Sequence, residues 1–116
     1  MASTWDKPAR RVAGLAQKLG LPGLSEGTSH RTPALKVRDK SFTRLKDPET
    51  LVLLVPLEHK ELLMEVAPDI YFETDHYKGW PAMLVRIRVI SDAELAHRLR
   101  AAWLLKAPKT LAKRLA

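Results

Sequence analysis

The chain has 116 residues and a mass of 13.1 kDa, which fits one domain spanning 1–116 and leaves little room for a second. It contains no cysteine, which excludes disulfides, thiolate catalysis, zinc–thiolate sites and iron–sulfur clusters. No stretch approaches the ~18 apolar residues that cross a bilayer, and the first eight residues lack the apolar core of a signal peptide. We therefore expect a cytoplasmic protein without a membrane partner.

The net charge of +7 is distributed unevenly along the chain. Residues 1–40 carry +5, residues 41–80 carry −4 and residues 81–116 carry +6. A basic protein of this kind suits a polyanionic partner such as nucleic acid. Whether the basic segments meet in space depends on the fold.

The first half of the chain predicts one helix followed by strands. Apolar residues at helical spacing predict a helix over 8–19, with Asp6 as its cap and Gly20 at its end. The polar stretch 25–32 has too few apolar residues to form core alone. From Pro33 the period changes to two, which predicts three strands joined by tight turns, at 33–37, 41–46 and 50–55.

The second half predicts a short amphipathic helix over 58–67, with Leu62, Leu63 and Val66 on its apolar side. A strand over 70–72, an aromatic loop over 74–81 and a strand over 82–90 follow.

A capping box, Ser91 to Glu94, predicts the start of the last long helix. Its apolar face is formed by Leu95, Leu99, Ala102 and Trp103, and Pro108 interrupts it. The ends, 1–6 and 109–116, are expected to fray, the second as a short basic continuation.

This order of elements, α-β-β-β-α-β-β-α, predicts an α+β fold with a mostly antiparallel sheet of about five strands and three helices. An antiparallel sheet can keep one face in contact with water. Lys36, Arg86 and Arg88 alternate with apolar neighbours and fit such a face.

Short motifs along most of the chain resemble the MmcQ/YjbR family, also called DUF419. In the first half these are Leu21-Pro22-Gly23, Glu26, Thr28-Ser29-His30, Pro33, Val37, Lys40 and Phe42. In the second half they are Pro-Leu-Glu at 56–58, the Pro68 turn, Thr74-Asp75-His76-Tyr77, Gly79-Trp80 and Glu94-Leu95.

The resemblance implies an α+β fold likened to a "double wing" DNA-binding motif, in which β-hairpins project beside helices, and a non-enzymatic, DNA-binding role. This implication rests on fold analogy. The chain departs from the pattern at Leu35, where an aromatic residue is common, and at Pro81 after Trp80. The second departure bears on the shape of the aromatic loop.

The basic residues of the predicted hairpins are the main candidate for nucleic-acid contact. Six cations face one acid, Asp39, within sixteen residues, and such hairpins can follow a phosphate backbone. Lysine and arginine also protect strand edges from aggregation, so a solvated edge is the alternative. The full candidate set is Arg31, Lys36, Arg38, Lys40, Arg44, Lys46, Lys78, Arg86 and Arg88.

The loop rings His76, Tyr77 and Trp80 are candidates for stacking on exposed bases. Aromatic side chains in so small a protein are also typical of core or loop packing, and both interpretations stay open.

Glu26, His30, Asp75 and His76 would suit a metal site or an acid–base pair only if the fold brought them together. No known metal-ligand spacing, nucleophile elbow or phosphate-binding glycine loop is present. The sequence thus predicts no catalytic residue, metal or cofactor.

The preferred hypothesis is a DNA-binding module that uses a basic β face. The alternative is a protein-interaction or small-ligand-binding domain that uses the His/aromatic loop or the acidic middle segment, in which Asp47 to Asp75 holds eight acids and one lysine. The oligomeric state stays open.

Overall fold

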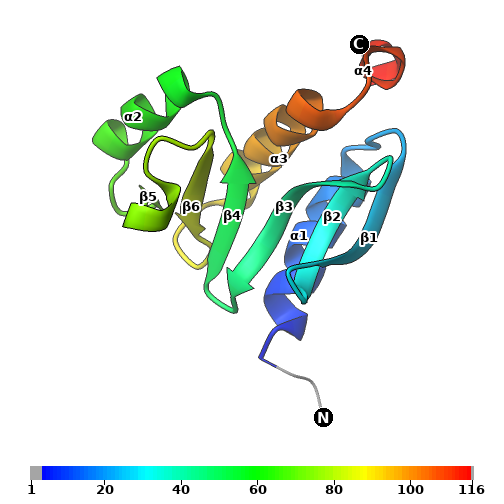
Figure 1. Ribbon diagram of the computed structural model, residues 1–116. Helices are drawn as coiled ribbons and strands as arrows, with labels where there is room; N and C mark the ends of the chain where they lie inside the picture. Colours follow the sequence, from blue (N-terminus) through cyan, green and yellow to red (C-terminus); the bar gives the residue numbers. More distant parts are fainter. Residues whose placement is uncertain (1–3, 116) are drawn as a thin grey trace.

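The computed structural model describes residues 4–115, which form one antiparallel sheet with helices behind it and at one edge (Figure 1). The strands lie in the order β1-β2-β3-β4-β6-β5. The elements in chain order are α1 (Asp6–Lys18), β1 (Leu24–Ser29), β2 (Thr32–Val37), β3 (Lys40–Asp47), β4 (Thr50–Leu54), α2 (Leu57–Val66), β5 (Tyr71–Phe72), the 3₁₀ helix η1 (Asp75–Tyr77), β6 (Ala82–Arg86), α3 (Asp92–Lys106) and α4 (Lys109–Leu115).

Helices α1 and α3 cover one face of the sheet, which we call the helix-covered face (Figure 1). The predicted apolar side of α3 packs here, and Leu99 and Trp103 are completely buried. The Ser91 hydroxyl accepts the amide of Glu94 at 3.2 Å, as the capping box predicts. Arg11 of α1 donates to the carbonyl of Ile90 at 2.7 Å, so α1 is fixed to the turn that starts α3.

A smaller apolar cluster lies on the opposite face, which we call the open face. Val52 of β4 and Ala82 and Leu84 of β6 form its floor, and Tyr77 of η1 covers them. Since successive strand residues point to opposite faces, the floor and the main core share the same strands. The open face is therefore apolar only beneath η1.

The predicted α+β class and antiparallel sheet are confirmed, although the described residues contain six strands and four helices. The additional strand, β1, occupies most of the polar stretch 25–32, for which no strand is predicted from the sequence. An edge strand bonds on one side only, and here both of its faces are largely exposed, so few apolar residues are needed. His30 and Arg31, with φ of 52° and 67°, form its two-residue turn into β2.

Two further expectations about element ends are wrong. The strand predicted over 82–90 stops at Arg86, because the chain turns over 87–89, where the amides of Val89 and Ile90 donate to the Arg86 carbonyl. The tail predicted to fray contains α4, whose Leu111 is buried. The side chain of Leu111 approaches Gly23, whose φ is 71°. A Cβ added at Gly23 would lie only 3.0 Å from Leu111 Cδ1, so both the φ angle and the space favour glycine here.

Helices α1 and α2 also differ from expectation. Asp6 is the first residue of α1 rather than its cap, in the turn where the helix dipole favours an anion. In α2, Leu62 and Val66 are exposed, whereas Lys60 is buried against the sheet edge. The apolar pattern of α2 therefore points partly toward solvent.

Candidate nucleic-acid interface

Three of the predicted cations project from the open face. Arg44 of β3 is paired with Val52, and Arg86 lies two residues beyond Leu84 on β6, so both share the face of the smaller apolar cluster. Lys36 lies two residues beyond Ala34, which is paired with Arg44. Cross-strand partners point to the same side, which places the three cations on one surface.

The open-face cations are held by neighbouring groups. Arg44 donates to the Tyr77 hydroxyl at 3.1 Å, and Arg86 donates to the Pro68 carbonyl at 3.1 Å. The Arg86 guanidinium also lies 4.1 Å from the centre of the Phe72 ring. Lys36 runs beside Gly27 of β1, where a Cβ would lie 3.5 Å from its Cε. These contacts restrict the cations before any ligand arrives.

The other predicted hairpin cations do not join this surface. Arg31 and Arg38 occupy two-residue turns at opposite ends of β2. Lys40 is paired with Val37, whose side chain belongs to the main core, so Lys40 leans toward the helix-covered face. Lys46 is exposed where the register between β3 and β4 shifts.

Arg88 and Lys78 lie outside the strands that carry the three cations. Arg88 follows the end of β6, in the turn, and forms an exposed ion pair with Glu49 at 3.2 Å. The expected continuous row with Arg86 and Arg88 on one strand is therefore wrong. Lys78 follows η1 within the aromatic loop and is exposed.

The three predicted stacking residues have different environments. Tyr77 is only 9% exposed and covers the floor of the open face, so its ring is not available to a base. His76 is exposed and meets Tyr77 edge-on at 5.0 Å between ring centres. Trp80 is 64% exposed. Trp80 is thus the loop residue that retains a large free aromatic surface.

Lys60 organises this loop and was not predicted from the sequence. It is 2% exposed, and its Nζ donates to the carbonyl oxygens of Tyr77 at 2.6 Å and Trp80 at 3.0 Å. Its charge is balanced by Glu73, whose carboxylate lies 2.7 Å away. A lysine within a polar run of a helix gives no periodic signal, so only the three-dimensional contacts reveal its role.

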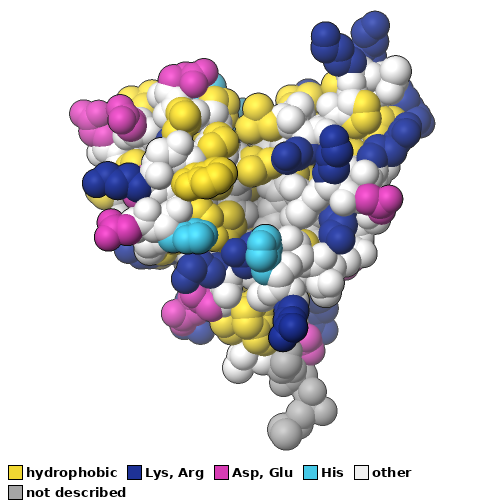
Figure 2. Space-filling view, in the orientation of Figure 1, with side chains coloured by type: hydrophobic (Ala, Val, Ile, Leu, Met, Phe, Trp, Pro, Cys, Tyr) yellow, Lys and Arg dark blue, Asp and Glu magenta, His cyan; other side chains and the backbone are white. Residues whose placement is uncertain are grey.

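The charges are segregated in space as well as along the chain. Acidic side chains gather over α2, at the upper left of Figure 2, whereas lysines and arginines spread across the centre and the opposite side. The exposed acids of α2 are Glu58, Glu61 and Glu65. The three acids of α2 therefore lie beside the open face, whereas Asp75 lies on η1 over it, and Asp47 and Glu49 lie at the β3–β4 turn.

The candidate group of Glu26, His30, Asp75 and His76 does not come together as a single site. Glu26 is paired with Leu35, faces α1 and accepts a hydrogen bond from Gln17 at 2.9 Å, whereas His76 lies on the loop over the open face. His30 bonds its neighbour Ser29 at 3.2 Å. Within residues 4–115, no cluster of three or more His, Asp or Glu side chains has the arrangement of a metal site.

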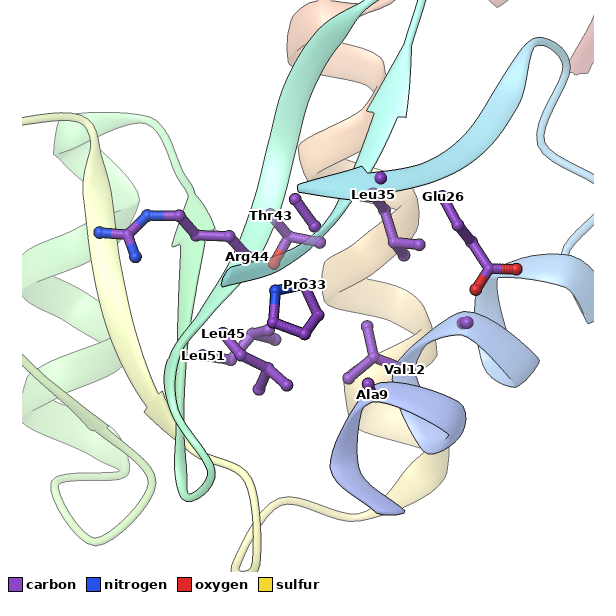
Figure 3. A pocket seen from close by; sticks show the side chains of 12 residues that line it. Ala9, Val12, Glu26, Pro33, Leu35, Thr43, Arg44, Leu45 and Leu51 are labelled. Atoms are coloured by element: carbon purple, nitrogen blue, oxygen red, sulfur yellow. The ribbon is translucent and has the colours of Figure 1, made fainter. Parts of the chain in front are cut away.

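A small crevice of about 50 Å³ lies between α1 and strands β1–β3 (Figure 3). Val12, Leu35, Leu45 and Leu51 point into it, whereas Arg44 extends away from it toward the open face (Figure 3). The Thr43 hydroxyl, also in its lining, already donates to the carbonyl of Val52 at 2.7 Å. Most of the crevice lining is aliphatic, and Arg44 borders both the crevice and the open face.

Comparison with known proteins places this arrangement in a family. The sequence model of the YjbR family matches residues 19–105, which include all the strands and the open-face cations. The chain belongs to the YjbR family. The resemblance seen in the sequence motifs is therefore confirmed.

Relatives of this YjbR chain include the uncharacterised proteins Rv2570 of Mycobacterium tuberculosis and Mb2600 of Mycobacterium bovis. Each is 31% identical over 125 residues, covering 94% of this chain and 92% of the relative. The crystal structure of Deinococcus radiodurans protein DR2400, with a DUF419 domain, is similar with a TM-score of 0.69 and 23% identity, over 90% of this chain and 84% of that one. That likeness supports the α+β fold.

Proposed function

We propose that this protein binds nucleic acid, with DNA as the preferred candidate, by placing the phosphate backbone on the open face. The observation that carries the proposal is that Lys36, Arg44 and Arg86 project from the sheet face that α1 and α3 leave uncovered. Each cation that neutralises a phosphate releases condensed counterions, so binding is strongly salt-dependent. Contacts of this kind position a ligand without reading its sequence.

The proposed role is non-enzymatic and cytoplasmic. The non-enzymatic role is supported by the absence of a catalytic motif from the sequence. Among residues 4–115, no helix combines the length and apolarity that crossing a membrane requires.

The test is fluorescence anisotropy with a labelled oligonucleotide at low salt. The variant Lys36→Gln/Arg44→Gln/Arg86→Gln should weaken binding at least tenfold, because each phosphate contact adds to the affinity. The matched control, Arg10→Gln/Lys18→Gln/Arg100→Gln, removes the same charge from exposed positions on α1 and α3. Equal losses in the two variants, or no binding by the unmodified protein, would contradict the proposal.

A second candidate function, protein interaction, is favoured by the outer surface of α2. Leu62 and Val66 are 57% and 66% exposed, one helical turn apart, among the exposed acids Glu58, Glu61 and Glu65. This surface suits a basic amphipathic helix. Calorimetric titration with a synthetic Leu/Lys amphipathic peptide should show binding, and Leu62→Glu should abolish it. If the unmodified protein gives no heat of binding with this peptide, basic amphipathic helices are excluded as partners.

A further inference from the structure

The loop between β5 and β6 holds an exposed indole beside the open face. Trp80 is 64% exposed, whereas Trp103 is completely buried. Burying an aromatic side chain is among the larger favourable contributions to folding, and Trp80 does not make it. The position of Trp80 therefore has no evident explanation in the packing of the fold.

The backbone of Trp80 is held in place by hydrogen bonds, one of them from Lys60 of α2. Lys60 bonds the carbonyl oxygens of Tyr77 and Trp80, and the Trp80 amide donates to the Tyr77 carbonyl at 3.0 Å. The Lys60–Glu73 pair secures the start of the loop as well. An exposed ring on a restrained backbone loses little conformational entropy when it binds.

The same loop is connected to the basic surface. The ring of Tyr77 lies over Val52 and Leu84, and its hydroxyl accepts the hydrogen bond from Arg44. Lys78, two residues before Trp80, is exposed. Hydrophobic, basic and histidine side chains accordingly appear together near the centre of Figure 2. The loop thus places an aromatic ring and cations at one margin of the open face.

We infer that the open face takes single-stranded nucleic acid, with Trp80 stacking on one of its bases. This inference rests on the proposed function. Within a duplex, bases are paired and stacked, and an indole at the surface cannot reach their faces. A basic surface combined with an exposed aromatic ring is the arrangement by which proteins hold single strands. Among the described elements, no α-helix stands on the open face, and the 3₁₀ helix η1, which does, has only three residues; a longer helix would be needed to enter a major groove.

The experiment compares Trp80→Ala with the unmodified full chain, using a labelled dT oligomer and a duplex of equal length at low salt. We expect Trp80→Ala to weaken binding of the single strand about 5- to 150-fold, the range for loss of one stacked base. Duplex binding should change less than about twofold, because phosphate contacts remain. Leu105→Ala, at another exposed apolar position, is the matched control and should change neither.

Intrinsic fluorescence gives a second readout. Stacking should quench Trp80 when unlabelled dT oligomer is added, and Trp80→Phe should remove this signal while retaining part of the affinity. Single-strand binding that is unchanged in Trp80→Ala would overturn the inference and leave the proposed function standing. Equal losses for duplex and single strand would also overturn it. No binding to either nucleic acid would instead contradict the proposed function.

Discussion

The two faces of the sheet differ in what covers them. The helix-covered face is closed by α1 and α3 and contains the largest buried side chains, including Trp103 and Leu99. The open face is apolar only beneath Tyr77, and elsewhere it carries the side chains of Lys36, Arg44 and Arg86. The helix-covered face therefore holds most of the buried core that stabilises the fold, which leaves the open face free to carry charge for a ligand.

Trp103→Ala should have the largest effect on stability, because it opens a cavity in the helix-covered face. It also removes the bond from Nε1 to the Pro22 carbonyl. We expect a loss of about 3–5 kcal/mol in the free energy of unfolding, measured by urea denaturation. Trp80→Ala is the matched change on the open side and should stay within about 0.5 kcal/mol. Similar losses in the two variants would remove the distinction between the faces.

Lys60→Met should come next, because it leaves Glu73 without its cation and two carbonyl groups without their donor. Removing one partner of a buried pair costs about 3 kcal/mol. Urea denaturation should show this loss, and adding Glu73→Leu should restore part of it. A Lys60→Met variant as stable as the unmodified protein would show that the loop is fixed by other contacts.

Alkaline pH should destabilise the helix-covered face through Tyr71. Burial and the hydrogen bond to Glu94 raise the pKa of Tyr71 above its ordinary value. The unfolded chain therefore loses this proton first, so stability is retained below pH ~10 and falls as the pH rises further, by at most about 1.4 kcal/mol per pH unit. Tyr71→Phe should flatten this alkaline part of the stability profile; an unchanged slope would contradict the assignment.

Tyr77→Phe should lower stability less than Trp103→Ala and Lys60→Met do. It removes the hydroxyl that accepts from Arg44 but keeps the ring over the apolar floor. We expect a loss of about 1 kcal/mol in thermal or urea unfolding. Tyr77→Ala is the comparison that also removes the ring, and it should cost clearly more. Equal losses would mean that the ring contributes nothing to the floor.

The sequence predicts the elements with strong periodicity. The apolar side of α3 and its Ser91 cap were both identified, because a buried face and a capping box leave regular local patterns. The edge strand β1 was missed, since an edge exposed on both faces has no alternation to detect. In α2 the sequence predicts that Leu62 and Val66 face the core, but both are exposed. Lys60 is buried instead, because it contacts a loop that lies further along the chain.

The candidate site could be predicted only in part. Alternation places Lys36, Arg44 and Arg86 on strands, but strand order decides that they share a face. Arg88 does not share this face, because the chain leaves the sheet after Arg86 and the Arg88 side chain pairs with Glu49. The separate environments of Tyr77 and Trp80 depend on how Lys60 holds their loop, which sequence spacing does not reveal.

The most direct test of the central claim is the salt dependence of nucleic-acid binding. The logarithm of the association constant for a dT oligomer should fall linearly with the logarithm of salt concentration, with a slope of about −0.7 per phosphate contact. In Lys36→Gln/Arg44→Gln/Arg86→Gln we expect the slope to be smaller by about 2, since three contacts are removed. An unchanged slope, or an equal reduction in Arg10→Gln/Lys18→Gln/Arg100→Gln, would contradict the assignment of the open face as the binding surface.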